Sequence, residues 1–170
     1  PYQRKVKDFH HLMDGSTNDM PRVYGIEEAG HRADFKLEEI VEFLYASSGG
    51  DKRVFGQAVL DLHAALDKAA LKVSSKEHSE STMVGQVDAL IDLLYLTYGS
   101  FVLMGVDPKP FFDTVHEANM GKIFPDGKAH FDPVTHKILK PSDWEERFAP
   151  EPHIKRELDR HIQKSLQRNK

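Results

Sequence analysis

Two groups of carboxylates in this chain have the residue types and spacing that binding of a divalent cation requires. Asp88 and Asp92 are the only charged residues between Val84 and Val106, and their separation by four positions puts both on one helical face. Burying two neighbouring carboxylates is costly unless a cation lies against them. A Lys or Arg side chain could supply that charge. Mg²⁺ could also do so, because it prefers carboxylate oxygens and keeps coordination positions for water and phosphate.

The second acidic group has the pattern Glu-Glu-x-x-Glu and comprises Glu38, Glu39 and Glu42. At about 100° per residue, these glutamates fall within an arc of roughly 100° at the edge of an apolar stripe. Taken alone, such a run is typical of a solvated helix face. Packed antiparallel against the helix that carries Asp88 and Asp92, it would form a five-carboxylate cup. That cup could hold one or two Mg²⁺ ions, with Mn²⁺ as the alternative ion.

Apolar periodicity predicts the helices that must position these carboxylates. The helix that carries Asp88 and Asp92 is apolar nearly all round, as the central helix of a bundle would be. Helices are expected over residues 5–13, 31–46, 54–73, 82–104, 108–122 and 152–167. Asp107 is the expected N-cap of the fifth helix, with Pro108 at the first helical position.

Strand patterns are nearly missing, so the expected fold class is all-α. Residues 74–81 form a polar connection, and Pro and Gly dominate the segment from Pro125 to Trp144. We therefore expect a four-helix-bundle-like core, an irregular or hairpin-like C-terminal segment and a terminal helix. The catalytic domain is expected to cover residues 1–145. The charged helix within residues 146–170 would pack on this bundle or on a second subunit.

The composition excludes several functional classes. The chain has no Cys, which excludes disulfides, Cys-ligated zinc and thiol catalysis. Its formal net charge of −4 argues against a dedicated nucleic-acid-binding surface. The first residues carry no apolar signal segment, and the charge-free stretch from Leu93 to Val106 is too short to span a bilayer. We expect a cytoplasmic protein that binds neither membranes nor nucleic acid.

At its acidic residues the chain resembles the superfamily of MazG-like proteins and phosphoribosyl-ATP pyrophosphohydrolases, which are all-α nucleoside triphosphate pyrophosphatases. The pattern of that superfamily is Glu-Glu-x-x-Glu on one helix and Glu-x-x-Asp on a later one. The segment from Glu38 to Glu42 matches the first part, and Asp92 matches the final Asp. Ala89 stands where the superfamily has a Glu, and Asp88, one turn before Asp92, is the expected substitute.

Similar short motifs follow downstream in the same order as in one branch of this superfamily. They are Gly105-Val106-Asp107-Pro108, Glu117-Ala118-Asn119-Met120-Gly121-Lys122, Asp126-Gly127-Lys128 and His136-Lys137-Ile138-Leu139-Lys140-Pro141. A Gly is expected where His136 stands, so that turn should be altered. The resemblance covers about residues 31–144.

The resemblance implies Mg²⁺-dependent hydrolysis of a nucleoside triphosphate to the monophosphate and pyrophosphate, with housecleaning of the nucleotide pool as a biological role. The implied metal ligands are Glu38, Glu39, Glu42, Asp88 and Asp92, with Glu39 also as the base. Because a triphosphate carries about four negative charges, Lys or Arg donors should face the metal. The expected substrate-binding residues are Asn119, Lys122, Lys128, Lys137, Lys140, Arg32 and, near the nucleobase, Phe9, with His10 as the alternative to Phe9. The alternatives are ordinary surface positions for Lys128 and Lys137 and a core position for Phe9.

Two alternative functions share most of these features. The first is hydrolysis of another phosphoanhydride, such as phosphoribosyl-ATP or dUTP. The second is a non-catalytic α-helical interaction module, which would bind a partner without Mg²⁺-dependent turnover. The resemblance also implies a homodimer or a higher homo-oligomer, in which a second copy would complete the walls around the acidic helices.

Overall fold

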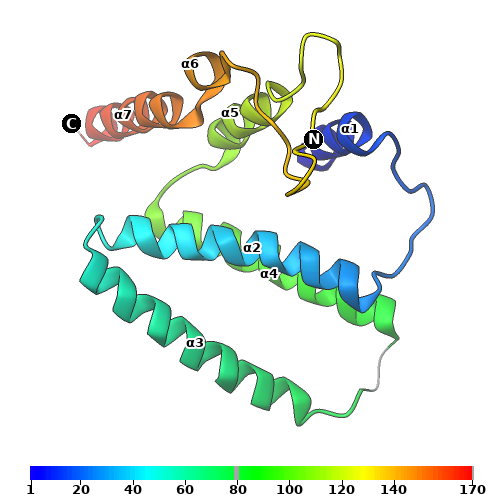
Figure 1. Cartoon of the computed structure of the whole chain (residues 1–170). Helices are drawn as coiled ribbons and strands as arrows, with labels where there is room; N and C mark the ends of the chain where they lie inside the picture. The colour runs from blue at the N-terminus through cyan, green and yellow to red at the C-terminus, as the bar shows by residue number, and fades with distance from the viewer. Residues whose placement is uncertain (79–80, 170) are drawn as a thin grey trace. The chain divides into compact units, whose positions relative to one another are not determined.

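Helices form nearly all of the regular structure in this protein. The computed structural model describes residues 1–78 and 81–169, which contain seven α-helices and no β-strand and so confirm the all-α class (Figure 1). The helices are α1 (Tyr2–Asp14), α2 (Ile26–Ser47), α3 (Lys52–Ser74), α4 (Thr82–Met104), α5 (Lys109–Met120), α6 (Trp144–Phe148) and α7 (Pro150–Arg168). Residues 79 and 80 of the predicted polar connection, and residue 170 of the C-terminal segment, lie outside the described residues.

Helix α2 begins at Ile26, earlier than residue 31, where apolar periodicity predicts its start. Glu27 and Glu28 occupy its first turn, where negative charge is favourable because the first backbone N–H groups have no partner inside the helix. Arg22 forms an ion pair of 2.6 Å with Glu28, and the hydrogen bond from Arg22 lowers the pKa of this carboxyl. These polar interactions extend the helix beyond its apolar stripe.

Helix α5 begins one residue later than predicted. Its first residue is Lys109 and its N-cap is Pro108, whereas the sequence predicts Asp107 for the cap. Pro has no side-chain acceptor that could cap a helix. The Asp107 carboxylate instead accepts a hydrogen bond of 3.0 Å from the backbone N–H of Lys109. The Asp107 side chain therefore still bonds the first backbone N–H of α5, although Asp107 lies one residue before the N-cap.

Helix α6 lies at the end of the segment predicted to be irregular. It is 5 residues long, which is too short to show an apolar period. Helix α7 follows after Ala149, and Pro150 occupies its first turn, where the missing N–H of Pro costs nothing. The bounds of α7 extend the predicted range of 152–167 by a residue or two at each end.

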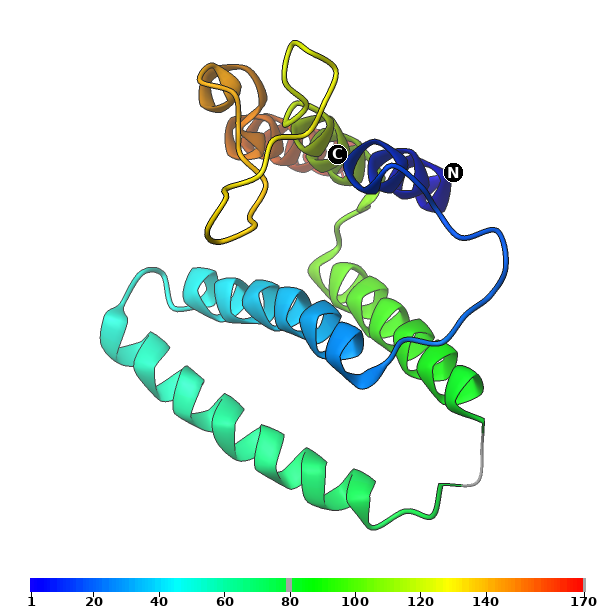
Figure 2. The same ribbon diagram turned by 45° about the vertical axis from the view of Figure 1, so that its right-hand side comes forward.

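Contacts divide the chain into two units, which are described separately. The first unit comprises Pro1–Pro21 and Ile91–Lys170. Its central element is α5, which contacts α1, α6 and α7 (Figure 2). An ion pair of 2.7 Å between Lys5 and Asp113 fastens α1 to α5. The buried hydrophobic residues of the described chain all lie in this unit and are Phe111, Ala118 and Trp144.

The second unit, Arg22–Leu90, contains the antiparallel hairpin of α2 and α3. Gly49 and Gly50 in the turn have φ angles of 63° and 82°, a left-handed conformation that Gly adopts at little cost. Tyr45 packs edge-on against Phe55 beside the turn, with 5.1 Å between the ring centroids. Away from the turn the two helices diverge in both views (Figures 1 and 2), and no residue of either helix is buried.

Helix α4 has the predicted bounds but not the burial that its composition predicts. With a mean hydropathy of 1.5, it is the one helix among the described residues long and apolar enough to cross a membrane by length and composition alone. The core helix of a soluble protein meets the same criteria. In the single chain no residue of α4 is buried. An apolar composition predicts that a helix is buried against another surface. It does not identify whether that surface belongs to the same chain or to another.

A hairpin-like turn closed by an antiparallel bridge between Phe131 and Ile138 lies within the irregular segment, as the sequence predicts. The carboxylate of Asp132 accepts a hydrogen bond of 2.7 Å from the backbone N–H of Thr135, which is the main cause of its lowered pKa. His136, where the sequence leads us to expect Gly, has a φ of 57° and is the one non-Gly residue with positive φ in the described part of the chain. The backbone of His136 is therefore strained in this turn.

Replacing His136 by Gly should stabilise the protein. The left-handed conformation costs a non-Gly residue about 1–2 kcal/mol, and the greater freedom of Gly in the unfolded chain offsets about 0.5–1 kcal/mol of the gain. We expect the free energy of unfolding to rise by up to about 1 kcal/mol, which calorimetry would detect as a Tm increase of about 3 °C. Gly127→Ala, at a φ of 77°, is the matched control and should lower Tm. A His136→Gly variant that melts at or below the parent Tm would contradict this account.

Candidate functional site

The glutamates of the first acidic motif lie on α2 with exposed side chains. They are Glu38, Glu39 and Glu42. Arg32 precedes them on the same helix, and its guanidinium carbon lies 5.7 Å from the ring centroid of Phe35. Partial burial and the positive charge of Arg32 together lower the pKa of Lys36. Helix α2 therefore carries a basic segment directly before its acidic one.

Asp88 and Asp92 lie one turn apart on α4, and both side chains are exposed in the single chain. Within the second unit, the Gln86 side chain accepts from the backbone N–H of Tyr24 and donates to its carbonyl, each at 2.9 Å. These two bonds join the start of α4 to the residues directly before α2. The start of α4 therefore lies beside Tyr24, and the antiparallel packing of the two acidic helices stays a prediction.

A metal-binding group is not assembled within the part of the chain that the structure describes. No cluster of three or more His, Asp or Glu side chains there could hold a metal ion. The five side chains are nevertheless all exposed in the single chain. Their role as a joint metal site stays a prediction from the motif and its spacing.

Two lysines that the sequence predicts to bind substrate lie at the ring of Trp144 in the first unit, and the predicted residue Asn119 bonds one of them. The Lys140 Nζ lies 4.2 Å from the centroid of this ring, and the Lys122 Nζ lies 6.0 Å from it. Lys122 also donates a hydrogen bond of 3.0 Å to the side-chain oxygen of Asn119. We call Asn119, Lys122 and Lys140 the lysine cluster. It brings two positive charges and an amide together at the end of α5.

A hydrogen bond fixes the ring that the lysine cluster surrounds. The Nε1–H of Trp144 donates to the backbone carbonyl of Ala118 at 2.7 Å, and the residue is only 7% exposed. This carbonyl is one of the last four of α5, which have no partner inside the helix. The other three accept hydrogen bonds from the backbone N–H groups of residues 121–123. Trp144 therefore completes the pairing of the helix end, and this constraint sets the orientation of its ring.

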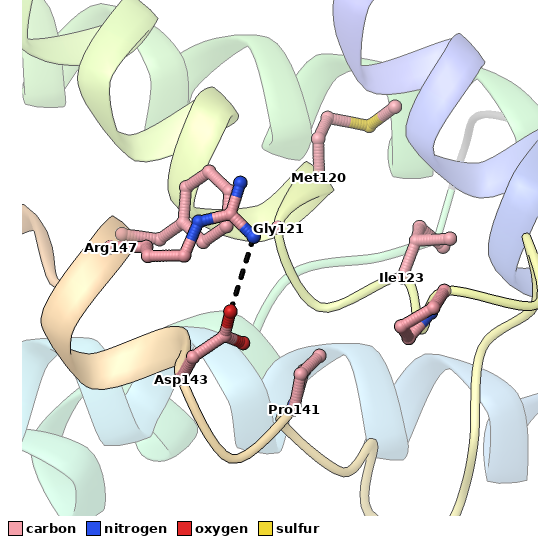
Figure 3. Close-up of a pocket in the computed structure, with 8 residues that line it drawn as sticks. Met120, Gly121, Ile123, Pro141, Asp143 and Arg147 are labelled. Atoms are coloured by element: carbon pink, nitrogen blue, oxygen red, sulfur yellow. Dashed lines mark hydrogen bonds and ion pairs between the residues drawn. The ribbon is translucent and has the colours of Figure 1, made fainter.

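A pocket of about 330 Å³ is formed by the same two segments of the first unit (Figure 3). Its lining residues are Met120, Gly121, Ile123, Pro125, Pro141, Asp143, Arg147 and Phe148. An ion pair of 3.2 Å joins Arg147 to Asp143, drawn as the dashed line in Figure 3. Gly121 and Pro141 adjoin Lys122 and Lys140 in the sequence, so the pocket and the lysine cluster depend on the same local backbone.

Only Gly fits at position 121, because the ring of Phe148 leaves no room for a side chain. A Cβ atom there would lie 2.5 Å from two ring carbons of Phe148. Its φ of −65° is ordinary for any residue, so backbone conformation does not explain the Gly. Phe148 thus holds the end of α6 against the end of α5, while Trp144 holds its beginning.

The remaining predicted contacts lie elsewhere. The Asp126 carboxylate accepts from the backbone N–H of Lys128 at 2.9 Å and pairs with His130 at 2.7 Å, and the bond to His130 is the main cause of its lowered pKa. Lys137 is exposed in the hairpin-like turn. Phe9 on α1 packs edge-on against His10 with 5.7 Å between the ring centroids. Substrate binding by Lys128, Lys137 and Phe9 stays a prediction.

Comparison with known proteins identifies the family. The family model for phosphoribosyl-ATP pyrophosphohydrolase matches residues 6–119, which is more than half of the chain. The chain belongs to this family. It is also similar to the crystal structure of a proposed NTP pyrophosphohydrolase from Exiguobacterium sp. 255-15, with 35% sequence identity and a TM-score of 0.86. That match covers 96% of this chain and 97% of the other. A comparison with curated proteins gave no match.

The family match includes both acidic motifs and ends at Asn119, so it contains one residue of the lysine cluster. Lys122 and Lys140 lie beyond the matched residues, as does Trp144. Trp144 is the site residue that our sequence analysis missed. The available signal was its position: it is the only Trp of the chain, and it lies four residues after Lys140. In the structure it is the first residue of α6.

Gly121→Ala should destabilise this member of the pyrophosphohydrolase family by about 1–3 kcal/mol, because overpacking a well-fitted contact forces side chains out of place. Urea unfolding would measure the loss. Phe148→Ala removes the ring that the new methyl group would meet. The double variant should therefore have nearly the same free energy of unfolding as Phe148→Ala alone. If Gly121→Ala is as stable as the parent, the close contact with Phe148 does not exist in solution.

Proposed function

We propose that this protein hydrolyses a nucleoside triphosphate to the monophosphate and pyrophosphate, with Mg²⁺ as its metal ion. Membership of the phosphoribosyl-ATP pyrophosphohydrolase family supports a reaction on a phosphoanhydride. The observation that carries the finer proposal is the combination of the acids on α2 and α4 with the lysine cluster at the end of α5. The proposed substrate is a deoxynucleoside or modified nucleoside triphosphate.

The five acids suit a hard divalent cation by their chemistry. Glu38, Glu39, Glu42, Asp88 and Asp92 offer only carboxylate oxygens, which are the ligands that Mg²⁺ and Mn²⁺ prefer. All five side chains are exposed in the single chain. The bound ion would lower the pKa of a coordinated water and neutralise part of the charge of the triphosphate.

The side chains of this chain have distinct proposed roles in the reaction. Glu39 accepts a proton from the attacking water. A new bond forms between that water oxygen and the α-phosphorus, and the bond from this phosphorus to the bridging oxygen of the β-phosphate breaks. Lys122 and Lys140 hold the charge of the departing pyrophosphate by charge-assisted hydrogen bonds. Arg32, Lys128 and Lys137 are proposed as further phosphate contacts, and Phe9 as a contact of the nucleobase.

A homodimer is the proposed active form, and the exposed surface of the single chain supports it. Large apolar residues of α2–α4 that are more than 60% exposed are Ile26, Phe35, Leu60, Leu66, Leu71, Val73, Tyr95, Leu96, Val102, Leu103 and Met104. A second copy offers the same apolar faces, which a two-fold interface can match to each other.

Glu39→Gln and Asp92→Asn should each abolish turnover and leave the fold intact. Loss of a general base lowers rates by about 10²–10⁴-fold, and both residues are exposed, so neither change disturbs a core. The measurement is pyrophosphate release from a panel of nucleotides, including dUTP and phosphoribosyl-ATP, with and without Mg²⁺. Circular dichroism would monitor the helix content.

Asp67→Asn is the matched control for these variants, because it neutralises another exposed carboxylate, on α3. It should turn over substrate like the parent. If Glu39→Gln and Asp92→Asn also behave like the parent, the assignment is wrong. If no nucleotide is hydrolysed by the parent in Mg²⁺, the non-catalytic interaction module becomes the better account.

Leu103→Glu should weaken the dimer. Leu103 is 91% exposed on α4, and a carboxylate in its place would be desolvated without a partner at an apolar interface. Sedimentation equilibrium should show the dissociation constant rising about tenfold or more, which corresponds to at least about 1.4 kcal/mol. Val134→Glu, at an 83% exposed position of the hairpin-like turn, should leave the constant unchanged. A parent protein that sediments as a monomer at micromolar concentration would refute the dimer.

A further inference from the structure

We infer that the pocket between the end of α5 and α6 binds the base of the nucleotide, and that Asp143 at this pocket selects guanine. The inference rests on the proposed function, because it names the base of the substrate that this protein would hydrolyse. Three features support it: the lining of the pocket, its position along the chain and the hydrogen-bonding groups of the Asp143–Arg147 pair.

The pocket combines an apolar interior with one polar side. Its volume of about 330 Å³ lies at the lower end of the range of about 300–1,000 Å³ for small-molecule pockets. Met120, Ile123 and Phe148 are half-buried, whereas Asp143 and Arg147 are exposed. Figure 3 shows the ion pair on the left of the pocket and the side chains of Met120 and Ile123 on its right. A flat ring system with a polar edge is the ligand that such a lining favours.

The walls of this pocket are largely fixed before a ligand binds. Pro125 and Pro141 have a locked φ, which limits the conformations of the irregular segment at the pocket. The Phe148 ring lies against the backbone of Gly121, where a Cβ atom would come within 2.5 Å of it. The Arg147 guanidinium carbon lies 4.9 Å from the centroid of the same ring. A preformed site loses little entropy on binding, which suits a small and rigid group such as a base.

The pocket adjoins residues that are proposed to contact the phosphates. Lys122 lies between two lining residues in the sequence, and Lys140 directly precedes a third. Because neighbouring Cα atoms are about 3.8 Å apart, the backbone of both lysines lies next to the pocket wall. One nucleotide could therefore place its base in the pocket and its phosphates at these lysines. Phe9 is not one of the described residues that line the pocket, so this is a separate assignment of base recognition.

The ion pair offers both an acceptor and a donor to the edge of a base. Arg147 donates to one oxygen of Asp143 at 3.2 Å, but a guanidinium has further N–H groups and a carboxylate has further lone pairs. Guanine is the standard base with N–H groups on two neighbouring atoms beside a carbonyl oxygen. The Asp143 carboxylate can accept from both N–H groups, and Arg147 can donate to the carbonyl. Bidentate pairing of this kind is strong and specific, so guanine is the favoured base.

Calorimetric titration with nucleoside monophosphates tests the pocket without turnover. A chelator is present, so that no divalent metal contributes. The protein should bind dGMP saturably and at least about tenfold more tightly than dAMP, dCMP or dTMP. The analogue dIMP lacks the 2-amino group and offers Asp143 one N–H group in place of two. It should bind about tenfold more weakly than dGMP, the effect of losing one hydrogen bond to a charged group. This comparison needs no variant.

Asp143→Asn should remove the preference for guanine. Asn has nearly the same size, but its amide nitrogen replaces one acceptor by a donor. We expect the affinity for dGMP to fall about tenfold or more, and the affinity for dAMP to change less than about twofold. Asp159→Asn on α7 is the matched control, because Asp159 is also an exposed acid, paired with Lys155 at 2.9 Å, and lies outside the lining of the pocket. It should bind every nucleotide like the parent.

The inference fails if the parent binds the four monophosphates equally or none of them saturably. It also fails if dIMP binds like dGMP, or if Asp143→Asn keeps the preference for guanine. Any of these results together with hydrolysis in the nucleotide panel would remove the base pocket and leave the proposed function. Guanine-selective binding that Asp143→Asn abolishes, without hydrolysis of any triphosphate, would support the pocket and remove the proposed function.

Discussion

The hydrogen bond from the Trp144 indole to the Ala118 carbonyl fixes the geometry of the first unit. It pairs the one carbonyl at the end of α5 that the following turn leaves without a donor. Both residues of this bond are buried, and with Phe111 they form the core of the unit. Because the bond spans 26 positions of sequence, it converts a short irregular segment into a defined structure. Lys122 and Lys140 take their positions from that structure.

The sequence predicts features that depend on neighbouring residues. Apolar periodicity gives the bounds of α4 and the all-α class, and motif spacing gives the two acidic groups. The hairpin-like turn also follows from local sequence, whereas the attention to His136 within it comes from the resemblance to the superfamily. In each case the determining interactions lie within a few residues along the chain, where periodicity and turn chemistry carry information.

Features that depend on distant contacts or on another chain could not be predicted in this way. The early start of α2 reflects a polar pair, Arg22 with Glu28, outside the apolar stripe. Trp144 was missed because its partner is remote in sequence. The exposure of α4 was missed because apolar composition fixes the need for a covering surface but not its source. The acids of α2 and α4 belong to the same category, since convergence of two helices is a tertiary property.

The absence of any buried residue in the hairpin of α2 and α3 has a consequence for how the protein gains its stability. A pair of helices without a core cannot offset the entropy of ordering its backbone from within. Folding of this hairpin is therefore linked to association with whatever covers it. When that cover is a second copy, mass action makes the melting temperature rise with protein concentration. Dilution would then lower stability and helix content together, without any change in sequence or solvent.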